Sequence, residues 1–166
     1  HQSMLCIRMH LYEKEGYEWL RALDHPGSRI RFLNEDRVED IMEVLAMFDL
    51  LITDYSSIYI DYLLLERPML FLPYDREDYL KTRGFNFDYD EVTPGPKPKS
   101  YAEFLNSIEG LLYNEMNYVE NRKKIERKFN KIQEPCSEYI CRMVKRIRMK
   151  GTKGRKNEKS DHIWNI

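Results

Sequence analysis

Short apolar runs alternate with segments of helical periodicity along most of the chain. The continuous apolar runs predict strands at 4–9, 30–33, 50–53 and 69–72. Between and after them, apolar residues recur every three or four positions, which predicts helices at 13–23, 38–48, 58–65, 76–81, 101–113, 118–132 and 137–149. Strands that alternate with helices and are apolar throughout are typical of a parallel sheet covered on both faces. The pattern therefore predicts an α/β fold with a doubly wound parallel sheet, followed by C-terminal helices.

Length and composition fit one domain with a tail. The chain has 166 residues, of which 42% are hydrophobic and 33% charged, as in a soluble globular protein. No apolar run reaches the ~18 residues that a membrane span needs. We expect a folded domain over 1–132, a basic amphipathic helix over 133–150 and a disordered basic tail over 151–166. The chain begins with His1 rather than Met, which indicates a fragment of a longer protein.

The net charge of −1 conceals an uneven distribution. Residues 1–120 contain 12 Lys and Arg against 23 Asp and Glu, whereas residues 121–166 contain 15 against 5. A basic tail indicates an anionic partner. Its apolar stripe, formed by Ile140, Met143, Val144 and Ile147, either packs on the body or lies on an anionic membrane surface. Nucleic acid is not expected as a partner, because aromatic residues are not interleaved with the basic ones.

Ser56 and Ser57 stand where a predicted strand gives way to a helix. Free backbone N–H groups and the positive end of the helix dipole favour a phosphate group there, and two hydroxyls add donors. The alternative is ordinary helix capping by the same residue types. Asp61, one turn further on, can bind a ribose or glycerol hydroxyl or orient a neighbouring side chain. Neither a dinucleotide-binding GxGxxG motif nor a Walker A motif is present.

Arg8 and His10 lie at the end of the first predicted strand. An arginine in a buried strand is costly unless it finds an anion, and a histidine at a strand end can contact phosphate or transfer a proton. A structural ion pair is the alternative for both. The acidic stretch Asp88–Glu91 resembles a DxD metal site only weakly, and the three cysteines form no zinc motif. We therefore expect no metal site and no cofactor.

Several motifs, taken together, resemble one enzyme family. They are RMH at 8–10, LLITDYSSIYIDYLLLERPMLFLPYD at 50–75, RGFNFDY at 83–89 and TPGP at 93–96. In this order they resemble the C-terminal domain of the CDP-glycerol glycerophosphotransferases, the enzymes of teichoic acid and capsule synthesis. The resemblance extends over residues 4–114 and more loosely beyond.

The resemblance implies a Rossmann-like donor-binding domain of a GT-B architecture. It implies that CDP-glycerol is bound by Arg8, Met9, His10, Ser56, Ser57 and Asp61, with His10 catalytic and with neither metal nor cofactor. The implied reaction transfers glycerol phosphate to a polyol-phosphate or lipid-linked acceptor and releases CMP. The implied location is the cytoplasmic face of a bacterial membrane.

The chain departs from the family pattern in one respect. The family's second catalytic histidine lies in a WHG-type motif of the N-terminal half, and neither Trp19 nor Trp164 is followed by His-Gly. We therefore expect these 166 residues to be inactive alone. A nucleotide-sugar glycosyltransferase of the same architecture and a non-catalytic binding fragment are the alternative interpretations.

Overall fold

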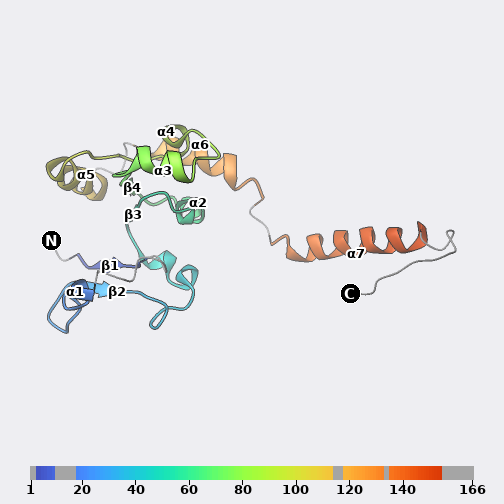
Figure 1. The fold of residues 1–166 in the computed structure, drawn as a ribbon, viewed down its shortest axis with the longest axis horizontal. Helices are drawn as coiled ribbons and strands as arrows, with labels where there is room; N and C mark the ends of the chain where they lie inside the picture. Colours follow the sequence, from blue (N-terminus) through green and yellow to red (C-terminus); the bar gives the residue numbers. More distant parts are fainter. Residues whose placement is uncertain (1–2, 10–17, 114–117, 133–134, 155–166) are drawn as a thin grey trace. The chain divides into compact units, whose positions relative to one another are not determined.

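The computed structural model describes residues 3–9, 18–113, 118–132 and 135–154. The chain divides into two compact units, His1–Phe129 and Asn130–Ile166, so the first unit ends three residues before the predicted boundary. Figure 1 shows the elements in sequence colours. They are β1 (Leu5–Ile7), α1 (Glu18–Arg21), β2 (Ile30–Phe32), η2 (Ile41–Glu43), η3 (Leu45–Met47), β3 (Leu51–Thr53), α2 (Ile58–Tyr62), η4 (Leu63–Leu65), β4 (Met69–Phe71), α3 (Arg76–Thr82), α4 (Tyr89–Val92), α5 (Tyr101–Tyr113), α6 (Val119–Phe129) and α7 (Ser137–Gly154).

The strands pair in parallel, as predicted. β1 pairs with β2, with Cys6 opposite Arg31, and β3 pairs with β4, with Ile52 opposite Leu70. Within the described residues these are two separate two-stranded sheets rather than one continuous sheet. The expectation of an α/β chain with parallel strands is confirmed, whereas the doubly wound sheet is not formed by these four strands alone.

β4 lies at the centre of the core. Met69, Leu70 and Phe71 are all fully buried. Tyr62 and Leu63 belong to the same core cluster as Met69 and Phe71. Burial of this kind stabilises by about 1.5–3 kcal/mol for each large apolar side chain. Helix α5 contacts β4, and helix α6 contacts η4 and adds Ile125 to the same core (Figure 1).

Gly95 and Pro96 pack directly on β4. The N–H of Phe71 donates to the carbonyl oxygen of Pro96 at 3.0 Å. A Cβ atom added to Gly95 would lie 2.2 Å from the carbonyl oxygen of Met69. The TPGP motif therefore needs glycine because the backbone approaches β4 too closely for any side chain.

The helix predicted at 38–48 is wrong. The structure has two short 3₁₀ turns there, η2 and η3. The guanidinium of Arg8 donates hydrogen bonds to the carbonyl oxygens of Val38 and Glu39. The carboxylate of Asp40 accepts a hydrogen bond from the N–H of Met42. These side chains occupy groups that an α-helix would have bonded to each other.

Two more elements differ from the prediction. Helix α4 was not expected in the aromatic segment, but Asp88 caps it by accepting the N–H groups of Asp90 and Glu91. Helix α7 continues to Gly154, five residues beyond the end of the helix predicted at 137–149. One glycine inside a helix costs only about 1 kcal/mol, and no proline ends α7. Residues 155–166 lie outside the described residues.

Candidate functional site

The turn between β3 and α2 presents the serine pair on the surface. Asp54, Ser56 and Ser57 are all exposed. The Ser56 N–H donates to Asp54 Oδ1 at 3.1 Å, and the Ile58 N–H reaches Ser56 Oγ at 3.4 Å. Ser57 stands at the helix N-cap and makes no side-chain capping bond. The turn thus offers exposed hydroxyls beside a helix start, which is the chemistry that a phosphate group requires.

Asp61 is exposed and belongs to the same short helix, α2. It follows Ser57 by four residues, so the two side chains share one helix face. The structure therefore brings three of the sequence-predicted residues, Ser56, Ser57 and Asp61, to neighbouring positions on the surface at the carboxyl end of β3.

Arg8 donates hydrogen bonds to backbone carbonyl oxygens. Its guanidinium donates to the carbonyl oxygens of Leu33 at 3.0 Å, Val38 at 2.7 Å and Glu39 at 3.2 Å. The carbonyl oxygens of the loop after β2 thus give this arginine neutral partners, and its predicted contact with the donor stays a prediction. Met9 is half-buried beside it. His10 lies outside the described residues.

An aromatic cluster anchors the serine turn. Tyr55 stacks on Tyr79 with ring centroids 4.0 Å apart, and Phe85 stacks on Tyr79 at 5.2 Å. The hydroxyl of Tyr89 donates to the carbonyl oxygen of Asp54 at 3.0 Å. Burial raises the pKa of Tyr55 and of Tyr89, so both phenols stay protonated near neutral pH. Sequence reasoning missed this support, although the RGFNFDY motif supplied its signal.

The acidic stretch at 88–91 has structural partners. Asp88 caps α4, and Asp90 pairs with Arg76 at 2.8 Å and with Lys97 at 3.7 Å. The hydrogen bond from Arg76 lowers the pKa of Asp90, and burial lowers the pKa of Lys97. No group of three or more His, Cys, Asp or Glu residues arranged for a metal ion occurs among the residues that the structure describes.

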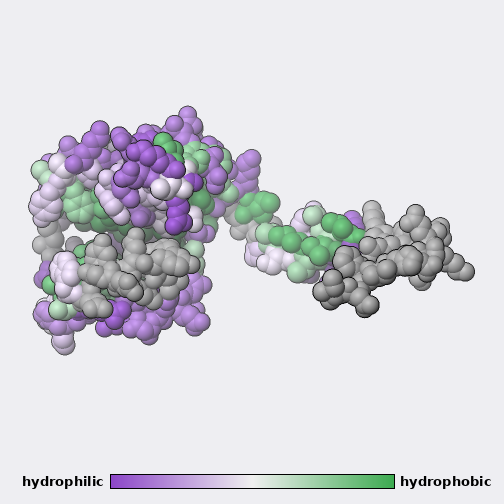
Figure 2. Space-filling model, in the orientation of Figure 1, coloured by the Kyte–Doolittle hydropathy of each residue, from purple (hydrophilic) through white to green (hydrophobic). Residues whose placement is uncertain are grey.

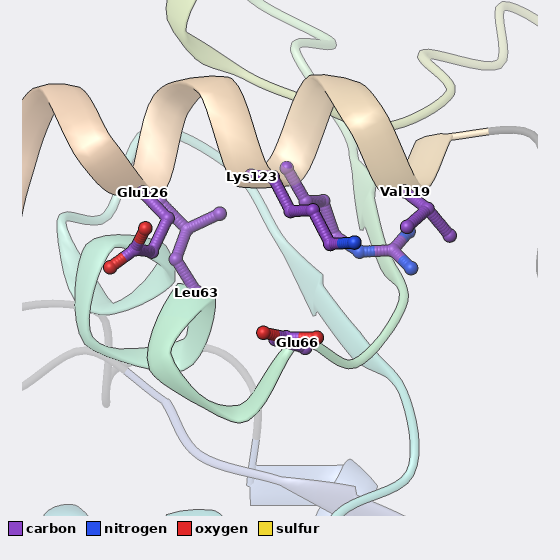
Figure 3. Close-up of a pocket in the computed structure, with 6 residues that line it drawn as sticks. Leu63, Glu66, Val119, Lys123 and Glu126 are labelled. Carbon is purple, nitrogen blue, oxygen red and sulfur yellow. The ribbon is translucent and has the colours of Figure 1, made fainter.

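Two cavities lie away from the serine turn. Figure 3 shows the first, where Lys123 and Glu126 of α6 face Leu63 and Glu66. Its volume of about 20 Å³ is enough for one water molecule. The second is an open groove of about 440 Å³ between α5 and residues 96–98. Ser56 and Ser57 line neither of them, and both serines are exposed among the described residues.

Parallel strand pairs and a serine turn at a strand end define an α/β protein with a candidate anion-binding edge. The family model described as CDP-Glycerol:Poly(glycerophosphate) glycerophosphotransferase matches residues 1–146. The chain belongs to this family, which confirms the resemblance drawn from the motifs.

Relatives with curated descriptions are proteins of teichoic acid synthesis. The teichoic acid glycerol-phosphate transferase of Staphylococcus aureus is 32% identical over 143 residues, which is 85% of this chain and 35% of the relative. The teichoic acid poly(glycerol phosphate) polymerase of Bacillus subtilis is 38% identical over 108 residues, covering 57% of this chain and 14% of the relative. The teichoic acid poly(ribitol-phosphate) polymerase of Bacillus spizizenii is 40% identical over 83 residues, covering 50% and 13%.

A solved structure has the same fold. The wall teichoic acid polymerase TagF superimposes with a TM-score of 0.65 at 29% identity, over 93% of this chain and 36% of that chain. A TagF variant soaked with CDPG gives the same TM-score at 28% identity. The chain thus spans about a third or less of the length of these proteins. Within the described residues, no helix has the length and apolar character to cross a bilayer.

Proposed function

We propose that this chain is the donor-binding part of a CDP-glycerol glycerophosphotransferase of teichoic acid or capsule synthesis. The family match over residues 1–146 carries the proposal. The exposed serine turn at the carboxyl end of β3 supports it, because ligands of parallel α/β sheets bind at this end of the strands. The complete enzyme has a GT-B architecture with a doubly wound sheet in this half, and the other half carries a second catalytic histidine.

In this proposal Ser56 and Ser57 hold the diphosphate of CDP-glycerol with their hydroxyls and the adjacent N–H groups. Asp61 accepts a hydrogen bond from a hydroxyl of the donor. An acceptor hydroxyl forms the new P–O bond to glycerol phosphate and gives its proton to the histidine of the other half, while the P–O bond to CMP breaks. His10 stabilises the charge that develops on the phosphates. No metal or cofactor takes part, and the acceptor is a polyol-phosphate or lipid-linked chain.

Arg8 and Met9 belong to the donor site in a different way. The guanidinium of Arg8 already donates to three carbonyl oxygens. We assign Arg8 the part of a positioning residue, which fixes the end of β1 and with it the backbone that leads to His10. Met9 contributes contact surface for CDP-glycerol.

Helix α7 adds a membrane contact to this proposal. Tyr139, Ile140, Val144 and Ile147 are each at least half exposed, and Figure 2 shows apolar residues on the surface of this helix. Basic residues border the stripe on both sides, as in helices that lie in the interface of an anionic bilayer. The protein would then act at the cytoplasmic face of the bacterial membrane, where the acceptor is held.

Calorimetric titration of the chain with CDP-glycerol, CMP and UDP-glucose tests donor binding. We expect CDP-glycerol and CMP to bind. Ser56→Ala/Ser57→Ala should weaken the binding of CDP-glycerol by at least about tenfold, because a hydrogen bond to a charged group contributes about 1.5–3 kcal/mol. Ser107→Ala in α5, a serine outside the turn, is the matched control and should bind like the wild type.

The other outcomes discriminate between functions. Preference for UDP-glucose would replace the proposal by a nucleotide-sugar glycosyltransferase. Equal binding by the double variant and the wild type would remove the serine turn from the site. A folded chain that binds none of the three ligands would favour a non-catalytic docking fragment.

A further inference from the structure

The strand pairing of β3 ends at Thr53, just before the serine turn. Thr53 lies opposite Phe71 in the parallel register, and its carbonyl oxygen accepts the N–H of Leu72 at 2.8 Å. The next carbonyl group along the chain, that of Asp54, lies beyond this register and accepts the hydroxyl of Tyr89 at 3.0 Å. A side chain from α4, 35 residues further along the chain, therefore continues where the sheet ends.

The bond from Tyr89 is a firmer attachment than the local hydrogen bonds of the turn. The N–H of Ser56 donates to Asp54 Oδ1 at 3.1 Å and that of Ile58 to Ser56 Oγ at 3.4 Å, and both bonds are exposed to competing water. The Tyr89 side chain is only 5% exposed, and a hydrogen bond from a buried group is electrostatically stronger than one in water. Burial also raises the pKa of Tyr89, so its hydroxyl keeps the proton for this bond near neutral pH.

Tyr89 is itself held by neighbours from several elements. Its ring meets that of Phe71 in β4 edge-on, with centroids 6.3 Å apart. Arg76 and Lys97 contact the same ring at 5.4 and 5.8 Å from its centroid. Both cations also pair with Asp90, the next residue of α4, at 2.8 and 3.7 Å. These contacts leave the hydroxyl of Tyr89 little freedom to move away from the turn.

Packing of the aromatic cluster does not by itself require a phenol at position 89. Two aromatic neighbours of Tyr89, Phe71 and Phe85, are phenylalanines and pack without a hydroxyl. Phenylalanine at position 89 would keep these ring contacts and lose only the donor to the carbonyl oxygen of Asp54. The hydroxyl of Tyr89 therefore acts on the turn, and its removal separates that action from core packing.

We propose that Tyr89 is a positioning residue of the donor site: by holding the carbonyl oxygen of Asp54, it fixes the turn that presents Ser56 and Ser57 to the diphosphate. This inference rests on the proposed function, because it concerns the same site. A turn that is already ordered loses little conformational entropy when its ligand binds, and a displacement of about 1 Å can lower a rate about 100-fold. Because Tyr89 is buried, it acts through the turn and does not touch the donor.

Donor binding and backbone dynamics of Tyr89→Phe test the inference. We expect calorimetry to show that CDP-glycerol binds about fivefold more weakly, which corresponds to the loss of one ordinary hydrogen bond. The ¹⁵N order parameters of the Ser56 and Ser57 amides should fall from about 0.85 towards 0.6. Tyr62→Phe is the matched control, because it removes a buried hydroxyl that donates to the carbonyl oxygen of Phe48 at 2.7 Å. It should lower the stability by a similar amount but leave donor binding and both order parameters unchanged.

A double-mutant cycle separates positioning from general destabilisation. Adding Tyr89→Phe to the Ser56→Ala/Ser57→Ala chain should cause no further loss of CDP-glycerol affinity, because Tyr89 acts through these serines. The amino acid 4-aminophenylalanine at position 89, whose amine donates from the same place, should restore wild-type binding.

The outcomes distinguish this inference from the proposed function. Wild-type affinity in Tyr89→Phe, or an additive loss in the triple variant, would overturn the positioning role alone. A wild-type chain that binds no CDP-glycerol would refute the proposed function, and the donor role of Tyr89 with it. Unchanged order parameters at Ser56 and Ser57 in Tyr89→Phe would overturn the inference whether or not the donor binds.

Discussion

At the scale of single residues, side chains that could bind a ligand often donate hydrogen bonds to the backbone instead. Arg8 donates to three carbonyl oxygens, and Arg67 donates to those of Ala46 at 2.8 Å and Phe48 at 2.6 Å. Such partners cannot be read from residue type, because every residue carries a carbonyl oxygen. The sequence therefore identifies which side chains can bind an anion, whereas the structure shows which of them are already occupied.

Substitution by alanine should change the free energy of unfolding in opposite directions at two glycines. Gly95→Ala would force a Cβ against the carbonyl oxygen of Met69, and we expect a loss of about 1–3 kcal/mol in the free energy of unfolding. Gly110→Ala in α5 meets open space and should gain about 0.5–1 kcal/mol, because alanine favours a helix. Denaturant unfolding of both variants measures this, and equal changes of the same sign would contradict the packing argument.

At the scale of elements, helices with a strong local signal were predicted well. The predicted helix at 101–113 has the observed bounds of α5. At its start the N–H of Glu103 donates to Ser100 Oγ, and the Glu103 carboxylate accepts the N–H of Lys99. The segment 38–48 has a similar apolar spacing but forms 3₁₀ turns, because Arg8 and Asp40 compete for its backbone groups. Helix formation thus followed the sequence where no distant side chain intervened.

Helix α7 should bind anionic vesicles through its basic residues and through its exposed apolar stripe. Lys145→Gln/Arg146→Gln should weaken binding to phosphatidylglycerol-containing vesicles by about tenfold or more, since each basic residue near the surface contributes about 1 kcal/mol. Ile140→Asp/Ile147→Asp should abolish it by placing charge in the exposed apolar stripe. Vesicle sedimentation at low and high salt measures the effect, with phosphatidylcholine vesicles for comparison.

Lys99→Gln is the control for lost charge, because it removes an exposed basic residue outside this helix. Deletion of residues 142–166 should likewise abolish binding. If the deleted protein still binds anionic vesicles, or if salt leaves binding unchanged, α7 is not the contact.

At the scale of the whole molecule, the proposed donor site lies on an exposed surface of the described residues. The serine turn is exposed, neither cavity includes it, and the chain spans 36% of the TagF chain. A site with one wall leaves its ligand largely solvated, which weakens both binding and charge stabilisation. We therefore expect catalysis to need more of the family polypeptide than this chain, as proposed above.

Transfer activity should depend on the longer protein. We expect the 166 residues alone to release no CMP from CDP-glycerol in the presence of acceptor. In the full-length enzyme, His10→Ala should lower kcat by about 100-fold or more, in line with the loss of a charge-stabilising or proton-transferring group. Turnover near that of the wild type would remove His10 from the mechanism, and CMP release by the short chain would show that it forms a complete site.

The sequence by itself determined the parallel α/β pattern, the bounds of α5, and the family through an ordered set of motifs. These follow from periodicity and residue type, which act locally. Only the tertiary structure decided that Arg8 holds carbonyl oxygens, that Asp88 and Asp90 serve a cap and ion pairs, and that Gly95 lies on β4. It also decided that the four strands of the described residues form two separate parallel pairs. These features depend on contacts between residues distant in sequence, whose partners are set by the packing of the whole unit rather than by local preference.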